Sequence, residues 1–144
     1  MIKALLDTNI LVSGFVSFKH PERPPAQILH AFRAGLFELV ISEDILKEVQ
    51  ETLKDPYFKN RLSSENITDT ITLLSEETTI TPVTAEVHGI ATHIEDDFIL
   101  AAAVSAEVDY LVTGDGPLLR KVGKSYRGVS LVTPNDFLKI LQQD

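Results

Sequence analysis

The chain has 144 residues, 44% hydrophobic and 24% charged, which suits one domain over residues 1–144 with one core. Its net charge of −8 argues against a general nucleic-acid coat, which would be basic, and the lack of cysteine excludes disulfides and thiolate metal sites. The longest apolar run, residues 98–104, is too short to cross a bilayer, and no signal-like segment is seen. We therefore expect a cytoplasmic protein outside the membrane.

Short apolar runs alternate along the chain with segments whose apolar residues recur at helical spacing. Strands are expected at residues 2–6, 37–41, 78–83, 110–113 and 129–132. Helices are expected at residues 10–18, 25–35, 43–53, 57–62, 96–107 and 117–122, with two more beginning after residue 63 or 64 and at residue 134. This alternation predicts an α/β fold of three layers, α/β/α, with a central parallel sheet.

Single residues mark the ends of several of these elements. Three prolines interrupt residues 20–25, which we therefore predict to be a loop. Pro82 favours an edge position for the third strand. The apolar residues Ile67, Ile71 and Leu74 share one side of a helix, and this pattern fits either the core or a dimer face.

Acidic residues stand where the expected elements meet one edge of the sheet. Asp7 ends the first strand, and Asp115 ends the strand at 110–113. Glu48 lies two turns into the helix after the second strand, and Asp96 and Asp97 open the helix after the third. Ligands of open α/β sheets bind outside the carboxyl ends of the strands, so these acids are candidate site residues.

Each acid also has an ordinary structural explanation. Asp7 or Asn9 suits a helix cap, Asp115 suits a turn, and Asp96 and Asp97 suit the positive end of a helix. As a group, however, clustered carboxylates repel one another unless a cation lies between them. Oxygen ligands without a partner histidine favour Mg²⁺ or Mn²⁺, and such ions could activate a water against a phosphodiester.

The helix period separates the two adjacent acids. Asp96 shares a face with Ile99, Leu100 and Ala103, the residues expected to pack on the sheet, and so it points toward the acid cluster. Asp97 is turned by about 100° from it. We therefore prefer Asp96 as the metal ligand and keep Asp97 as a supporting or substitute acid. Asn9 and Thr113, beside two of the acids, could orient carboxylates or bind water and phosphate, or could serve only as capping and turn residues.

Four segments in order resemble the PIN domain family. They are LLDTN ending at Asn9, SEDILKEVQETL around Glu48, DDFILAAAV from Asp96, and YLVTGDGPLL around Asp115. The chain is most similar to prokaryotic single-domain PIN proteins of the VapC toxin type. The resemblance implies a metal-dependent nuclease acting on RNA, with Asp7, Glu48, Asp96 and Asp115 as its four acids and Thr113 and Asn9 as polar neighbours. It further implies Mg²⁺ or Mn²⁺, a homodimer and a small antitoxin partner.

One dense basic stretch follows Asp115 and is the candidate RNA-binding surface. Its members are Arg120, Lys121, Lys124 and Arg127. Phosphate contacts require such groups near the metal, although a solvated surface run would look the same.

Three other functions compete with the nuclease. A receiver-like signalling domain also uses edge acids and Mg²⁺, but it requires a Lys after the last strand, where this chain has Thr133 and Pro134. A phosphatase of the haloacid-dehalogenase type requires a second Asp two residues after the first, where this chain has Asn9. A catalytically silent PIN domain that binds protein or RNA remains the main alternative, and the four filled acid positions argue against it.

Overall fold

The computed structural model describes residues 1–143 of the chain. The strands within this range are β1 (Lys3–Leu6), β2 (Glu38–Ser42), β3 (Thr79–Thr81), β4 (Tyr110–Val112), β5 (Ser125–Tyr126) and β6 (Val129–Val132). The helices are α1 (Thr8–Val16), α2 (Pro24–Arg33), α3 (Glu43–Leu53), α4 (Pro56–Lys59), α5 (Ser64–Glu77), α6 (Ile94–Ser105), α7 (Gly116–Val122) and α8 (Pro134–Gln142).

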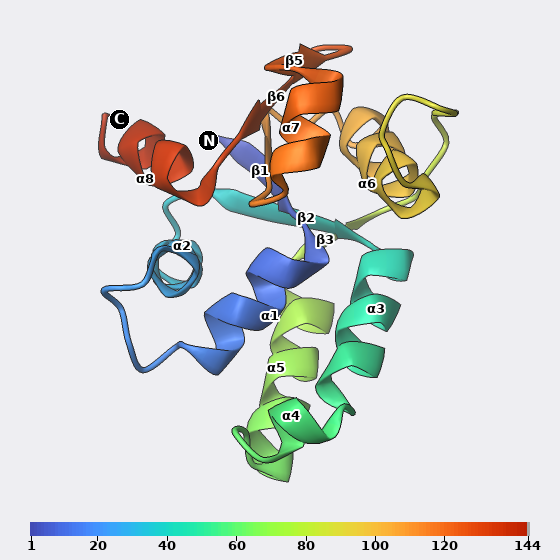
Figure 1. Cartoon of the computed structure of the whole chain (residues 1–144). Helices are drawn as coiled ribbons and strands as arrows, with labels where there is room; N and C mark the ends of the chain where they lie inside the picture. Colours follow the sequence, from blue (N-terminus) through green and yellow to red (C-terminus); the bar gives the residue numbers. More distant parts are fainter. Residues whose placement is uncertain (144) are drawn as a thin grey trace.

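The strands form one sheet in the order β3-β2-β1-β4-β6-β5. All neighbouring pairs are parallel except β5 and β6. Figure 1 shows α1, α3 and α5 on one side of the sheet and α6 and α7 on the other, while α8 packs against α2. The prediction of a three-layer α/β/α fold is confirmed, and β3 lies at the edge of the sheet as Pro82 indicated.

The core forms where the helices cover the two central strands. In β1, Ala4, Leu5 and Leu6 are fully buried, because helices cover both faces of a parallel sheet. Leu74 of α5 is also fully buried, while Ile67 and Ile71 are half-buried against the core. Leu74 thus belongs to the core, and Ile67 and Ile71 pack against it from the same side of α5.

Strand β5 is an element that the sequence did not predict. It pairs antiparallel with β6 across Arg127 and Gly128, whose φ angles of 48° and 88° lie in the left-handed region. Two successive residues in this region form the turn that a two-residue hairpin requires. The basic stretch predicted as the candidate RNA-binding surface therefore also contains an edge strand of the sheet.

The segment from residue 82 to residue 93 crosses the molecule without regular secondary structure. Ser105 Oγ of α6 accepts hydrogen bonds from the backbone N–H groups of Thr84 (3.0 Å) and Ala85 (2.9 Å). Arg127 Nη1 donates to the carbonyl oxygen of Glu86 at 3.2 Å. Side chains of neighbouring elements thus bind the backbone polar groups that a ladder would otherwise pair.

The two central strands lead away from each other at their carboxyl ends. Strand β1 continues into α1 and on to β2 on one side, whereas β4 continues through α7 to β6 on the other. This reversal of direction leaves a crevice between the ends of β1 and β4, the usual place for a ligand in an open α/β sheet. Asp7 and Thr113 follow these strands directly and so lie at the crevice.

None of the helices within residues 1–143 is both long enough and apolar enough to span a membrane.

Candidate active site

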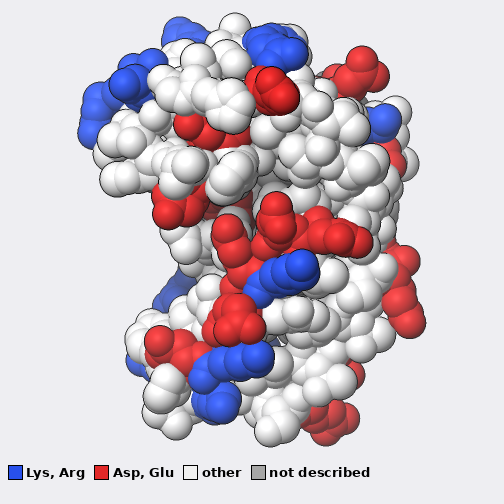
Figure 2. Space-filling view, turned by 90° about the vertical axis from the view of Figure 1, so that its right-hand side faces the viewer, with Lys and Arg blue, Asp and Glu red and all other residues white. Residues whose placement is uncertain are grey.

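A pocket of about 490 Å³ opens at the crevice between β1 and β4, and we call it the acid pocket. Its lining residues are Asp7, Thr8, Asn9, Lys47, Glu48, Glu51, Thr52, Glu95, Asp96, Ile99 and Asp115. Figure 2 shows acidic side chains gathered in and around the hollow of this face, which has α6 above and α3 below, with a basic side chain directly against them. The structure thus brings together Asp7, Glu48, Asp96 and Asp115, the four acids that the sequence singled out.

Asp7 is buried where β1 ends, and both of its oxygens already accept hydrogen bonds. Oδ1 accepts from the N–H of Ile10 at 2.9 Å and so caps α1. Oδ2 accepts from Thr113 Oγ1 at 2.6 Å. Burial raises the pKa of Asp7 above its ordinary value of 3.8, the hydrogen bond from Thr113 opposes this rise, and the charge of Asp115 adds to it. Asp7 is therefore both the cap of α1 and an acid of the pocket.

Thr113 connects the acids at the ends of β1 and β4. It is fully buried, and its Oγ1 donates to Asp7 while accepting from the N–H of Asp115 at 3.0 Å. Asp115 Oδ1 in turn accepts from the N–H of Leu118 at 3.1 Å and caps α7. One hydroxyl thus fixes the carboxylate of Asp7 and the backbone of Asp115.

Glu48 enters the pocket from α3 and is held from across it. Its Oε2 accepts a hydrogen bond of 2.6 Å from Thr8 Oγ1, the first residue of α1. Ser42 begins α3 by accepting from the N–H of Ile45 at 3.1 Å, which sets the start of the helix at the sheet edge. Thr8 therefore orients Glu48, a role that the sequence analysis did not assign to it.

Asp96 lies on the opposite wall, in the first turn of α6. Its pKa is raised, first by partial burial and then by the negative charge of Asp115, with a smaller contribution from Asp7. Asp7, Asp96 and Asp115 thus repel one another across the pocket. Their mutual repulsion is the electrostatic condition that a bound cation would relieve.

Asp97 has a different environment from Asp96. It is buried, and its two oxygens accept from the backbone N–H groups of Gly89 (3.0 Å), Ile90 (3.2 Å) and Ala91 (2.8 Å). It is not among the residues that line the acid pocket. The turn of about 100° between adjacent helix positions separates the two acids as expected. The contacts of Asp97 favour an anchor for the loop at residues 89–91 over a supporting metal ligand.

The remaining predicted residues lie around the pocket or beside it. Asn9 is exposed and lines the acid pocket. Arg120 and Lys121 belong to α7, and Arg127 is engaged with the carbonyl of Glu86. The basic stretch thus runs next to the helix that Asp115 caps, and none of its members is among the residues that line the pocket.

Five further polar pocket residues were missed in the sequence, although part of the signal was there. One of them, Glu95, directly precedes Asp96. Glu51 and Thr52 follow Glu48 by three and four positions, which places them on its side of α3. Thr8 and Lys47 adjoin Asp7 and Glu48 in sequence, but only the three-dimensional pairing of α1 with α3 shows that they face the pocket.

The four acids of the pocket fit a hard divalent cation. Asp7, Glu48, Asp96 and Asp115 all offer carboxylate oxygen, the ligand type that Mg²⁺ and Mn²⁺ prefer. Within residues 1–143, no three acidic or histidine side chains converge in one metal-binding group, so the acids line the pocket without enclosing an ion. Mg²⁺ is commonly held by one or two carboxylates and several waters, which this open arrangement allows.

Comparisons with known proteins agree with this fold. The profile of the PIN domain family matches residues 3–116, and the chain belongs to this family. Among solved structures it is similar to VapBC2 from Rickettsia felis, in a crystal structure with a DNA fragment from their promoter, with a TM-score of 0.59, 18% identity, and 92% and 98% of the two chains covered. It is also similar to PAE2754 from Pyrobaculum aerophilum, with a TM-score of 0.55, 18% identity, and 99% and 91% covered. A comparison with curated protein sequences gives no match.

Replacing Asp97 is expected to destabilise the fold, whereas replacing Asp96 is not. Asp97→Ala leaves three backbone N–H groups without their acceptor, and we expect the free energy of unfolding to fall by about 2–4 kcal/mol. Asp96→Ala, one residue away on α6, removes a carboxylate that its neighbours repel, and should leave stability unchanged or higher. Urea unfolding without metal measures both variants, and equal losses would contradict the separation of roles.

Asp7→Asn is expected to stabilise the metal-free protein in a pH-dependent manner. Because the pKa of Asp7 is raised in the folded state, the folded protein binds more protons than the unfolded chain above pH 3.8. The wild type therefore loses stability as the pH rises through the raised pKa, while Asn does not titrate. Melting temperatures with a chelator at pH 4.5 and 7.5 should show a gain for Asp7→Asn that is larger at pH 7.5. Asp55→Asn, the same chemical change at an exposed helix cap, is the control.

Proposed function

We propose that this protein is a metal-dependent endoribonuclease that hydrolyses RNA phosphodiester bonds, and that it is the toxin of a toxin–antitoxin pair. Proteins of the PIN domain family are generally nucleases, and the fold is shared with VapBC2. The observation that carries the proposal is the acid pocket at the ends of β1 and β4, where burial and neighbouring carboxylates raise the pKa of Asp7 and Asp96 beside Asp115. These three acids and Glu48 would hold Mg²⁺ or Mn²⁺.

The side chains of this site have distinct tasks in the proposed reaction. The chemistry that a bound Mg²⁺ or Mn²⁺ supplies is polarisation of the phosphodiester and activation of a water. Thr113 keeps Asp7 and the backbone of Asp115 in register, and Thr8 keeps Glu48 turned into the pocket. Asn9, exposed at the pocket, can orient a water or a phosphate oxygen. Preorganised acids need not rearrange when the substrate arrives.

Replacement of a pocket acid should abolish RNA cleavage. Purified wild type should cleave single-stranded or structured RNA with Mg²⁺ or Mn²⁺ and not with a chelator. Asp7→Asn and Asp96→Asn should each lower the rate at least about 100-fold, since even residues that only support metal ligands cost 10- to 100-fold.

The control for this experiment is Asp44→Asn, the same chemical change at an exposed acid of α3 outside the acid pocket. It should cleave like the wild type. Equal cleavage by Asp7→Asn and the wild type would place the activity elsewhere. Metal binding without cleavage of any RNA would favour the alternative, a silent PIN domain that binds protein or RNA.

A second surface supports a protein partner. A groove of about 410 Å³ lies between the end of α1, α2 and α5, with a floor that includes Phe15, Leu29 and Leu73. Lys19, Arg33 and Arg61 also line this groove, against one acid, Asp69, on a chain with net charge −8. An apolar floor with a basic rim fits a partner segment in which bulky apolar side chains alternate with carboxylates.

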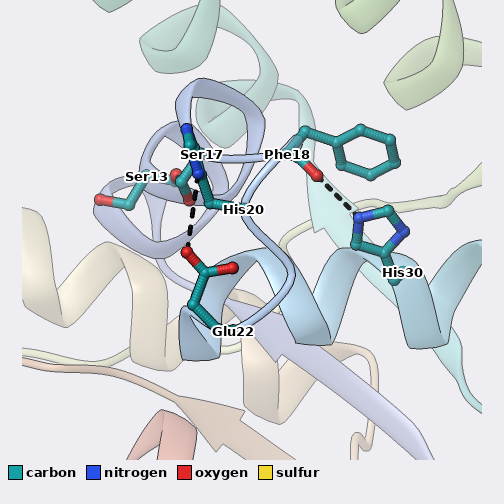
Figure 3. Close-up of polar contacts among 6 residues, drawn as sticks. All are labelled: Ser13, Ser17, Phe18, His20, Glu22 and His30. Carbon is teal, nitrogen blue, oxygen red and sulfur yellow. Dashed lines mark hydrogen bonds and ion pairs between the residues drawn. The ribbon is translucent and has the colours of Figure 1, made fainter.

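The turn after α1 forms one wall of this groove and is firmly held. His30 Nε2 donates to the carbonyl oxygen of Phe18 at 2.8 Å, and the two rings stack with centroids 4.0 Å apart (Figure 3). Ser17 Oγ donates to the carbonyl of Ser13 at 2.6 Å. Such a preformed wall lowers the ordering cost of binding. We propose that an antitoxin binds here. The homodimer implied by family resemblance also stays a prediction.

Charge reversal on the rim should weaken the complex with the partner. The test is co-expression with any small protein whose gene adjoins that of this chain, followed by gel filtration. We expect a stable complex for the wild type and at least a tenfold weaker one for Lys19→Glu with Arg33→Glu, two exposed rim positions. Lys59→Glu, exposed but outside the groove, is the control. A complex that withstands the rim reversal would place the partner on another surface.

A further inference from the structure

Lys47 is the one lysine or arginine among the residues that line the acid pocket in the described part of the chain. It is exposed and lies on α3, directly before Glu48. The other charged residues around it are all carboxylates. They are Asp7, Glu48, Glu51, Glu95, Asp96 and Asp115. The ammonium group of Lys47 has these six carboxylates as possible partners.

Lys47 binds none of these acids. The ion pairs found among residues 1–143, within 4.0 Å, are Lys54 with Glu51 at 3.1 Å and His20 with Glu22 at 3.6 Å. Glu51, which lines the pocket, is thus paired with Lys54, the residue that follows α3. The Lys47 ammonium keeps its three N–H donors available for a ligand.

We propose that Lys47 anchors a phosphate of the RNA next to the scissile one, an inference that rests on the proposed nuclease function. Cations at the central acids would offset their charge, but Glu95 at the pocket wall would still repel the neighbouring phosphates. A lysine at this wall supplies the compensating positive charge and direct N–H donors. Phosphate contacts of this kind position a nucleic acid without reading its sequence.

Arg120 supplies a second cation from the other side of the site. A Cβ on Gly116 would lie 3.0 Å from Arg120 Nη1, so the guanidinium lies against the first turn of α7, next to Asp115. An RNA strand crossing from α3 to α7 would meet Lys47, then the acids, then Arg120. The placement of these two cations defines the direction in which the strand crosses the pocket.

The test is steady-state cleavage of a single-stranded RNA by Lys47→Gln, which removes the charge but keeps most of the side chain. We expect KM to rise about five- to tenfold with kcat within twofold of wild type, because the anchor serves binding. The slope of log KM against log salt should fall by about 0.7, the value for one lost phosphate contact on a single strand. Lys47→Arg should restore both, and Lys59→Gln, an exposed lysine of α4 outside the pocket, should change neither.

The outcomes separate this inference from the function on which it rests. Metal-dependent cleavage by the wild type with unchanged KM and salt slope in Lys47→Gln would overturn the inference and leave the nuclease standing. A loss of kcat at unchanged KM would also overturn it, because Lys47 would then serve the reaction step. The absence of metal-dependent cleavage in the wild type would overturn the proposed function and the anchor with it.

Discussion

The pairing of β1 with β4 is the constraint on which the acid pocket depends. The register sets Leu6 opposite Val112, so Asp7 and Thr113 leave the sheet side by side. Their hydrogen bond of 2.6 Å joins the two strand ends, and the Thr113 hydroxyl also accepts a hydrogen bond from the backbone N–H of Asp115. Because α1 and α7 leave this edge in opposite directions, the crevice stays open to solvent. A shift of one residue in the register would turn these side chains to the other faces of the sheet.

Two acids of the pocket contribute both to the folding of the chain and to the negative charge of the site. Asp7 and Asp115 each begin a helix, so the same carboxylates that crowd the pocket also satisfy free N–H groups. Burial and mutual repulsion raise the pKa of Asp7 and Asp96, and the helix caps and Thr113 offset part of that cost at Asp7. Buried carboxylates that repel one another, and whose charge a cation would neutralise, are typical of functional sites.

The sequence predicted the layers, the order of the main elements and the acids at the sheet edge, because these follow from apolar periodicity and from where strands end. It separated Asp96 from Asp97 by the helix period alone. It did not show Thr8 or Lys47 at the pocket, because their position depends on how α1 packs against α3. It also missed β5, which depends on left-handed backbone at Arg127 and Gly128. Long-range pairing and local conformation thus account for what was missed.

The crossover at residues 82–93 is ordered by side chains that belong to other elements. Asp97 and Ser105, both on α6, accept hydrogen bonds from five backbone N–H groups of this segment, and Arg127 donates to one of its carbonyl oxygens. These contacts use only the backbone of the crossover, so they tolerate side-chain changes there except at the buried Val87 and Ala91 and at Gly89, whose φ is 68°. Local opening of α6 would remove the acceptors, so amide exchange in the crossover is coupled to the stability of that helix.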